Sequence, residues 1–500
     1  MTISGQLARV LLQSVGVVIL ARLLAPSDYG LVAMVLVIIG IGEVVRDFGL
    51  STAAVQAKTL SIEERTNLFW INSGIGLTLT VALMLGSPLV AALFGDSRLV
   101  GLTLVLAVTF LFNGIATQLR ADMNRDLSFG RLVVSDILGQ LFGLATGVVM
   151  ALSGFGYWSL AGQQVVLSLS TLTVVCVFAR WRPGRYRRDV PVRRFLKFGL
   201  EVIGAQALGY ASKNIDTLVI GTTLGATPLG YYNRAYQLLA LPLSQINAPS
   251  TRVALPVLSK LQTQRDRFGA YLLAGQTAML HLVLTIFSLT AAVAVPLVDL
   301  VLGDKWASVA PLFQILAVAG VFQTAGYATY WTFLAKGLTR SQLYWQLASR
   351  PIVIGAVIIG SFWGMTGVAT SYAGASVVTW FLGLLWIRRV SDVPVRGMFF
   401  NVVRAVSGYG VCAAAAWGAS LLARDHVPSL LLGIAGWLVA WALVTLAWPG
   451  FRRDVSTVVR MGKLLRRSKN VDVVPEVESE VGVSAEGEPL PRSSAAAVES

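Results

Sequence analysis

Residues 31–50 read LVAMVLVIIGIGEVVRDFGL, an apolar run in which only Glu43, Arg46 and Asp47 carry charge. An α-helix of about 20 apolar residues spans the roughly 30 Å hydrocarbon core of a membrane. This stretch therefore predicts a transmembrane helix whose charges gather near one end.

Similar apolar runs recur along most of the chain. We predict fourteen spans, at residues 6–24, 31–50, 69–92, 99–119, 132–153, 157–178, 198–222, 230–254, 277–301, 309–335, 346–364, 368–387, 402–423 and 428–448. The predicted fold class is therefore an all-α polytopic membrane protein.

The composition excludes a water-soluble globule. Of the 500 residues, 55% are hydrophobic and 13% charged, and the mean hydropathy is +0.70. A soluble chain carries roughly 25% charged residues. The two cysteines, Cys176 and Cys412, stand in apolar runs, so neither a disulfide framework nor a metal site built on cysteines is expected.

Loops rich in Lys and Arg alternate with loops that hold few of them. The net charge is +15, but 31 of the 40 Lys and Arg residues follow even-numbered predicted spans, and only four follow odd-numbered ones. Loops rich in Lys and Arg stay in the cytoplasm, so both termini are predicted to be cytoplasmic. This distribution over many short loops excludes a nucleic-acid groove.

The chain also repeats itself. Residues 24–30 read LAPSDYG and residues 224–230 read LGATPLG, at an offset of 200; residues 156–161 and 364–369 match more weakly at an offset of 208. Six spans per repeat keep both halves in the same orientation, which predicts two parallel six-helix lobes and a C-terminal helix pair. Paired lobes around a central cleft are typical of transporters.

Five segments follow from the repeat. We expect an N-terminal lobe, a basic cytoplasmic linker, a C-terminal lobe, helices 13 and 14, and a cytoplasmic tail that is disordered from about residue 468. Their predicted bounds are 1–178, 179–197, 198–388, 400–448 and 449–500. The basic start of the tail is predicted to lie against anionic membrane lipids.

Charged residues inside spans are candidates for function, because each costs at least about 2.5 kcal/mol at the bilayer centre. Glu43, Arg46 and Asp47 share one helix face near the cytoplasmic end of the second span. Pairing with each other at the membrane surface is an equally good interpretation of these three.

The seventh and eighth spans carry the other intramembrane charges. Lys213 and Asp216 share a helix face in the outer half, and Arg234 is predicted at a similar depth. Arg252 lies near the inner end, where it could also be a topology anchor. A cavity lined by these cations suits an anion bearing many hydroxyls, although a purely structural ion pair remains an alternative. The neighbouring polar candidates are Asn214, Tyr231, Tyr232, Tyr236 and Gln237.

Several of these stretches resemble one family. Residues 21–34 (ARLLAPSDYGLVAM), 47–51 (DFGLS), 214–221 (NIDTLVIG) and 229–238 (LGYYNRAYQL) are similar to bacterial polysaccharide-transport flippases. These form the lipopolysaccharide and exopolysaccharide branch of the multidrug/oligosaccharidyl-lipid/polysaccharide exporter superfamily. The resemblance covers about residues 1–450 and implies fourteen helices in the bacterial inner (plasma) membrane.

The resemblance also implies a substrate, a polyprenyl-pyrophosphate-linked oligosaccharide that moves from the cytoplasmic to the periplasmic leaflet, and other polysaccharide assembly proteins as partners. Arg46 or Arg252 would then receive the pyrophosphate at the inner side. Lys213 and Arg234, beside Asn214 and Tyr232, would hold it in the outward-open state. Glu43, Asp47 and Asp216 are candidates for pairing with these cations or for binding a coupling proton or Na⁺, and no other cofactor is expected.

Three alternatives remain. A drug/cation antiporter and a peptidoglycan-precursor flippase belong to the same superfamily. A membrane glycosyltransferase or polymerase is a third, but the predicted external loops are short, and no phosphate-binding loop, paired-carboxylate motif or His-rich metal spacing occurs in the sequence. The sequence therefore favours a transporter over an enzyme.

Overall fold

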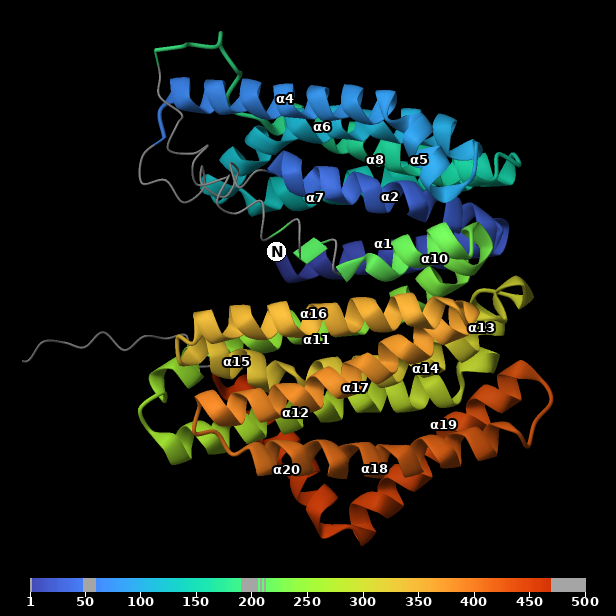
Figure 1. The fold of residues 1–500 in the computed structure, drawn as a ribbon, viewed down its shortest axis with the longest axis vertical. Coiled ribbons are helices and arrows are strands. Elements are labelled where there is room, and N and C mark those ends of the chain that lie inside the picture. The colour runs from blue at the N-terminus through green and yellow to red at the C-terminus, as the bar shows by residue number, and fades with distance from the viewer. Residues whose placement is uncertain (1, 48–59, 190–205, 207–208, 211–212, 469–500) are drawn as a thin grey trace, which may run out of the picture.

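The computed structural model describes residues 2–47, 60–189, 206, 209–210 and 213–468, and within these residues the regular structure is entirely helical. Figure 1 shows two groups of helices stacked one above the other, with α1 of the upper group and α10 of the lower group at the boundary where they meet. The upper group, here the N-lobe, holds α1 (Thr2–Leu23), α2 (Pro26–Asp47), α4 (Ile62–Leu85), α5 (Ser87–Phe94), α6 (Arg98–Arg125), α7 (Phe129–Leu152) and α8 (Tyr157–Phe178).

The second group is the C-lobe. It holds α10 (Ile215–Thr223), α11 (Ala226–Lys260), α12 (Arg265–Ala292), α13 (Ala294–Val301), the short helix η1 (Asp304–Trp306), α14 (Val309–Ala325), α15 (Tyr327–Ala335), α16 (Thr339–Ser361) and α17 (Gly364–Val390). Three more helices follow at the edge, α18 (Val395–Ser420), α19 (His426–Ala447) and α20 (Pro449–Ser468).

Eleven helical stretches of the described residues are long and apolar enough to cross a membrane. The predicted multi-pass, all-α fold is therefore confirmed. The count of fourteen stays a prediction, because residues 198–205 of the predicted seventh span lie outside the described residues. The long helix α11 is not among the eleven; it contains Arg234, Arg252 and three prolines.

The two lobes meet through the repeated turns. A Cβ atom on Gly30 would lie 1.7 Å from the carbonyl oxygen of Ala226, and one on Gly230 would lie 1.9 Å from that of Pro26. Positions 26 and 226, and positions 30 and 230, are equivalent in the repeat, so the contact is reciprocal, as at a twofold axis. The two glycines allow α2 and α11 to pack backbone against backbone.

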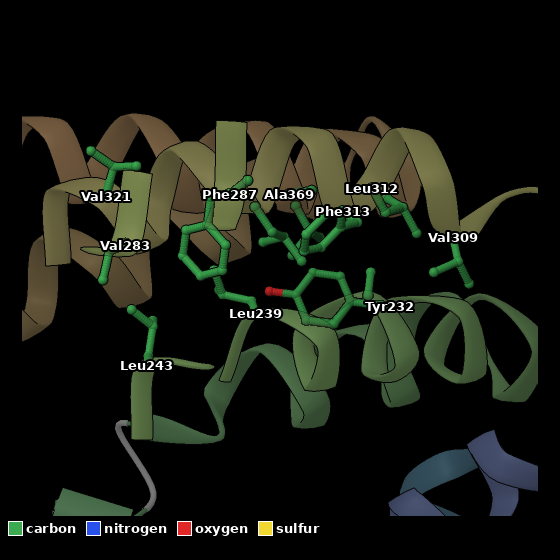
Figure 2. Close-up of a cluster of buried hydrophobic side chains, with 14 of the residues drawn as sticks. Tyr232, Leu239, Leu243, Val283, Phe287, Val309, Leu312, Phe313, Val321 and Ala369 are labelled. Atoms are coloured by element: carbon green, nitrogen blue, oxygen red, sulfur yellow. The ribbon is translucent and has the colours of Figure 1, made fainter. Parts of the chain in front are cut away.

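The core of the C-lobe lies between α11, α12, α14 and α17. Figure 2 shows Leu239, Phe287 and Phe313 packed together there, with the Tyr232 ring extending the cluster along α11. Close packing of these side chains makes the C-lobe a firm support for residues on its cleft side.

The basic linker begins directly after α8 and lies along α4. Asn67 donates to the Arg187 carbonyl (2.6 Å) and accepts from the Arg187 amide (2.9 Å), and Trp70 Nε1 donates to the Gly184 carbonyl (2.9 Å). The end of the linker and the start of the predicted second lobe lie outside the described residues, so the segment bounds remain predictions. We call the end of the molecule that carries this linker the basic end.

Candidate functional site

A seal between the lobes lies at the end opposite the basic end. Trp306 Nε1 donates to the Ala21 carbonyl (2.8 Å), and Arg22 donates to the carbonyls of Val301 (3.2 Å) and Leu300. Together with the α2–α11 contact, these bonds close the space between the lobes on that side. We call this group of contacts the outer seal.

Arg234 belongs to the outer seal. Its side chain is 8% exposed, its guanidinium lies 3.7 Å above the Tyr29 ring, and it donates to Gln237. It lines a small cavity of about 240 Å³ between α2, α8 and α11, which we call the interface cavity. The prediction that Arg234 shares a cavity with Lys213 and Asp216 is therefore wrong for this state, because its partner Tyr29 belongs to the other lobe.

Lys213 and Asp216 line a larger cavity of about 710 Å³ in the C-lobe. We call it the C-lobe cavity. Its polar lining combines two cations and a carboxylate with amides, hydroxyls and aromatic rings: Lys213, Arg350, Asp216, Gln323, Gln342, Gln346, Tyr236, Tyr327, Tyr330, Tyr372, Trp345 and Trp380. Such a lining can neutralise an anion and hydrogen-bond to many hydroxyls at once.

Asp216 is held by neutral donors. Its carboxylate accepts a hydrogen bond from the Tyr232 hydroxyl (2.9 Å) and one from the Thr217 amide (2.8 Å), and it is 4% exposed. The predicted pairing with Lys213 or Arg234 is not formed here. Tyr232 was predicted to contact the substrate, but here it is 0% exposed and its hydroxyl supports Asp216.

Arg350 is a cavity residue that the sequence analysis missed. It lies eleven residues after the start of α16, about 17 Å along the helix from the basic end, and its side chain is exposed. Arg350 was counted with the basic residues that follow the tenth predicted span, although the eleventh was predicted to begin at residue 346. The signal that could have placed it is Gly337, whose positive φ of 66° ends the preceding helix and lets α16 begin at Thr339.

The charges of the second span lie in a separate cavity of about 660 Å³ in the N-lobe, near the basic end. In this N-lobe cavity, Arg46 pairs with Glu43 (2.5 Å) and donates to Thr117, and Asn113 donates to Glu43 (2.9 Å). Asp47 also lines the cavity. Arg46 thus pairs with Glu43, while Arg46 and Asp47 face an open space.

Two further candidates remain at the edge of these sites. Asn214 donates to the Tyr210 carbonyl (2.9 Å) just before α10. Arg252 is exposed on α11, about 12 Å from the basic end, and is not among the residues that line the three cavities. The structure therefore places the predicted site residues in separate groups in both lobes, and it separates Arg234 from Lys213 and Asp216.

The family model of the polysaccharide biosynthesis proteins matches residues 19–311. The chain belongs to this family. It is 29% identical to the lipopolysaccharide biosynthesis protein WzxC of Escherichia coli (strain K12), over 81% of this chain and 82% of that protein. It is 26% identical to the teichuronic acid biosynthesis protein TuaB of Bacillus subtilis (strain 168), over 84% of this chain and 88% of that protein.

A third relative is the succinoglycan biosynthesis transport protein ExoT of Rhizobium meliloti (strain 1021), 25% identical over 78% of this chain and 79% of that protein. Among solved structures, the lipid II flippase MurJ in an inward closed conformation covers 91% of this chain and 99% of its own, with a TM-score of 0.69 at 14% identity. An inward-facing multidrug transporter of the MATE family has a TM-score of 0.63 at 16% identity, over 78% of this chain and 96% of its own. These two structures share the fold.

Proposed function

We propose that the protein is a flippase that moves a polyprenyl-pyrophosphate-linked oligosaccharide across the membrane for surface polysaccharide biosynthesis. The observation that carries the proposal is the C-lobe cavity, in which two cations stand among amides, hydroxyls and aromatic rings. The relatives, named for lipopolysaccharide, teichuronic acid and succinoglycan biosynthesis, support the class of substrate.

The orientation follows from the charges. The basic end, with the linker arginines, faces the cytoplasm of a bacterium whose inner membrane the protein spans. The outer seal then lies at the periplasmic face, and the described state receives substrate from the inside. The pyrophosphate and sugars occupy the cavities, while the polyprenyl tail stays in the surrounding lipid.

The cations act in sequence. Arg46 and Arg252, near the basic end, receive the pyrophosphate, and Lys213 and Arg350 neutralise it deeper in the C-lobe cavity. Opening the outer seal removes the Arg234 guanidinium from the Tyr29 ring. Arg234 is then free to hold the anion in the outward-open state.

Asp216 is the candidate coupling site. A buried carboxylate that receives only neutral donors among the described residues is costly as an anion, and a bound proton or Na⁺ would remove that cost. Tyr232 belongs to α11, one of the helices that form the outer seal, and its hydroxyl binds Asp216. Binding of a proton or Na⁺ at Asp216 would therefore affect the stability of the outer seal.

The test replaces Lys213 and Arg234 one at a time. K213Q and R234Q should each abolish surface polysaccharide while the protein stays at its normal level in the membrane. The matched control is R424Q, because Arg424 is an exposed cation in the loop between α18 and α19. Normal polysaccharide in both K213Q and R234Q would refute the assignment.

Loss of the gene, overexpression of the protein and the K213Q variant together separate the superfamily alternatives. A peptidoglycan-precursor flippase predicts that loss of the gene is lethal with a cell-wall defect. A drug antiporter predicts raised drug tolerance on overexpression, with surface polysaccharide unchanged by K213Q.

A further inference from the structure

One carboxylate near the basic end is shared by two arginines from different helices. Asp136 of α7 pairs with Arg120 of α6 at 2.8 Å and also with Arg9 of α1. The side chain of Asp136 is 18% exposed, that of Arg120 33% and that of Arg9 43%. Asp136 and Arg120 both line the N-lobe cavity. The cluster carries one net positive charge and can be reached from the cavity.

Helix α1 links this cluster to the outer seal. It packs on α7 from Arg9, which meets Asp136, as far as Gly16, which faces Leu144. At its other end, Ala21 and Arg22 bind the C-lobe through Trp306 and the end of α13. The same helix therefore touches both lobes, one at each membrane face.

We propose that Asp136 occupies, in the empty protein, the place of the substrate's pyrophosphate between Arg9 and Arg120, and that displacement of Asp136 by the anion loosens α1 and with it the outer seal. This inference rests on the proposed function, since it adds Arg9 and Arg120 to the cations that receive the pyrophosphate near the basic end and gives their release from Asp136 a mechanical role. It makes Asp136 a positioning residue.

The chemistry favours such an exchange. Guanidinium groups bind the oxygens of phosphates and carboxylates with the same fork geometry, and a pyrophosphate carries more charge than one carboxylate. A ligand shifts a conformational equilibrium only through contacts that differ between the two states. Transfer of Arg9 from Asp136 to the ligand is such a contact, because it removes the ion pair between α1 and α7.

The first measurement is binding of inorganic pyrophosphate to the full-length protein in lipid nanodiscs. D136N should bind about 3–10-fold more tightly than the wild type, because the competing carboxylate is gone. The double variant R9Q/R120Q should lose at least about tenfold in affinity. D136E, which keeps the charge, and D96N, which removes a similar Asp–Arg pair at the other end of the molecule, should bind like the wild type.

The second measurement reports on the seal. In a C176S/C412S background, A33C places a thiol in the interface cavity, and a membrane-impermeant maleimide applied from outside labels it only when the seal opens. D136N should raise the labelling rate several-fold, whereas D96N should leave it unchanged. Affinity in D136N equal to or below that of the wild type, or labelling that D136N does not change, would overturn the proposal. Neither assay contains an oligosaccharide, so failure here and failure of the proposed function are distinguishable.

Discussion

Arg350 lines the C-lobe cavity from α16, about 17 Å along that helix from the basic end. In R350Q the cavity keeps its shape but loses half of its positive charge, so we expect surface polysaccharide to fall about tenfold or more. Cell-surface polysaccharide would be measured against R340Q, which removes an exposed arginine near the start of the same helix. Equal polysaccharide in R350Q and R340Q would show that Arg350 does not bind substrate.

Asp216 is tested by separating its charge from its hydrogen bond. D216N should abolish the dependence of transport on the proton or Na⁺ gradient, because the ionisable group is gone. Y232F keeps the carboxyl but removes one hydrogen bond, worth about 1 kcal/mol, and should retain the gradient dependence with a lower rate. If D216N transport still followed the gradient, coupling at Asp216 would be ruled out.

At the scale of single residues, the sequence predicted which charges are unusual but not what they touch. Lys213 and Asp216 were identified because ionisable groups are rare in a span. The partner of Arg234 could not be identified, since Tyr29 is about 200 positions away and belongs to the other lobe. Asp136 and Arg120 escaped notice because each stands within a few residues of a basic loop, where a charge is unremarkable.

The elements that form the outer seal depend on two glycines. In G230V the new side chain would meet the Pro26 carbonyl, so α2 and α11 must separate, at a cost of about 1–3 kcal/mol to the sealed state. Labelling of A33C from outside should therefore rise in G230V. The control is G410A in α18, where a Cβ meets no atom within 4 Å; unchanged labelling in G230V would contradict the role of this contact.

Helix α20 is docked on the C-lobe by an ion pair. Arg404 of α18 binds both carboxylate oxygens of Asp454 (2.5 and 2.7 Å), and His281 of α12 lies 3.8 Å from the same group. Burial works to raise the pKa of the Asp454 carboxyl, but the hydrogen bonds from Arg404 and the positive charge of its guanidinium outweigh burial, so the pKa lies below its usual 3.8. A lowered carboxyl pKa stabilises the docked helix above about pH 4, and this stability is lost as the pH falls through the lowered value.

A spin label at V459C, an exposed position on α20, would report this docking. We expect the label to be immobilised between pH 5 and 8 and to gain mobility below about pH 4. D454N should be mobile at every pH, and D392N, an exposed carboxylate before α18, should behave like the wild type. Immobilisation of the label in D454N would mean that the ion pair does not hold the helix.

At the scale of elements, the local pattern was enough for most spans, and tertiary packing decided the rest. The run at residues 157–178 coincides with α8, because helix formation in lipid follows from apolar length alone. The predicted span at residues 69–92 is divided into α4 and α5 at Gly86, and the helix α16 begins seven residues before its predicted start. Polar residues that line a cavity do not look like a membrane span, which hid the first half of α16.

The whole molecule follows from the duplication. The short match at residues 24–30 and 224–230 predicted paired lobes, and in the structure these two turns pack against each other. What the match could not supply is the state of the molecule, because sealing at one end depends on contacts such as Trp306 with Ala21 that join segments far apart in the sequence. The interface cavity likewise exists only after the lobes have packed, because α2, α8 and α11 line it together.

The central claim is that the molecule translocates a completed lipid-linked oligosaccharide. The most direct test deletes the gene and compares polyprenyl-linked oligosaccharides in intact cells and in spheroplasts treated with a membrane-impermeant glycosidase. We expect complete repeat units to accumulate and to be protected from the enzyme, because synthesis proceeds while translocation fails. Incomplete units, which a transferase predicts, or unchanged lipid-linked pools, which a drug antiporter predicts, would contradict it.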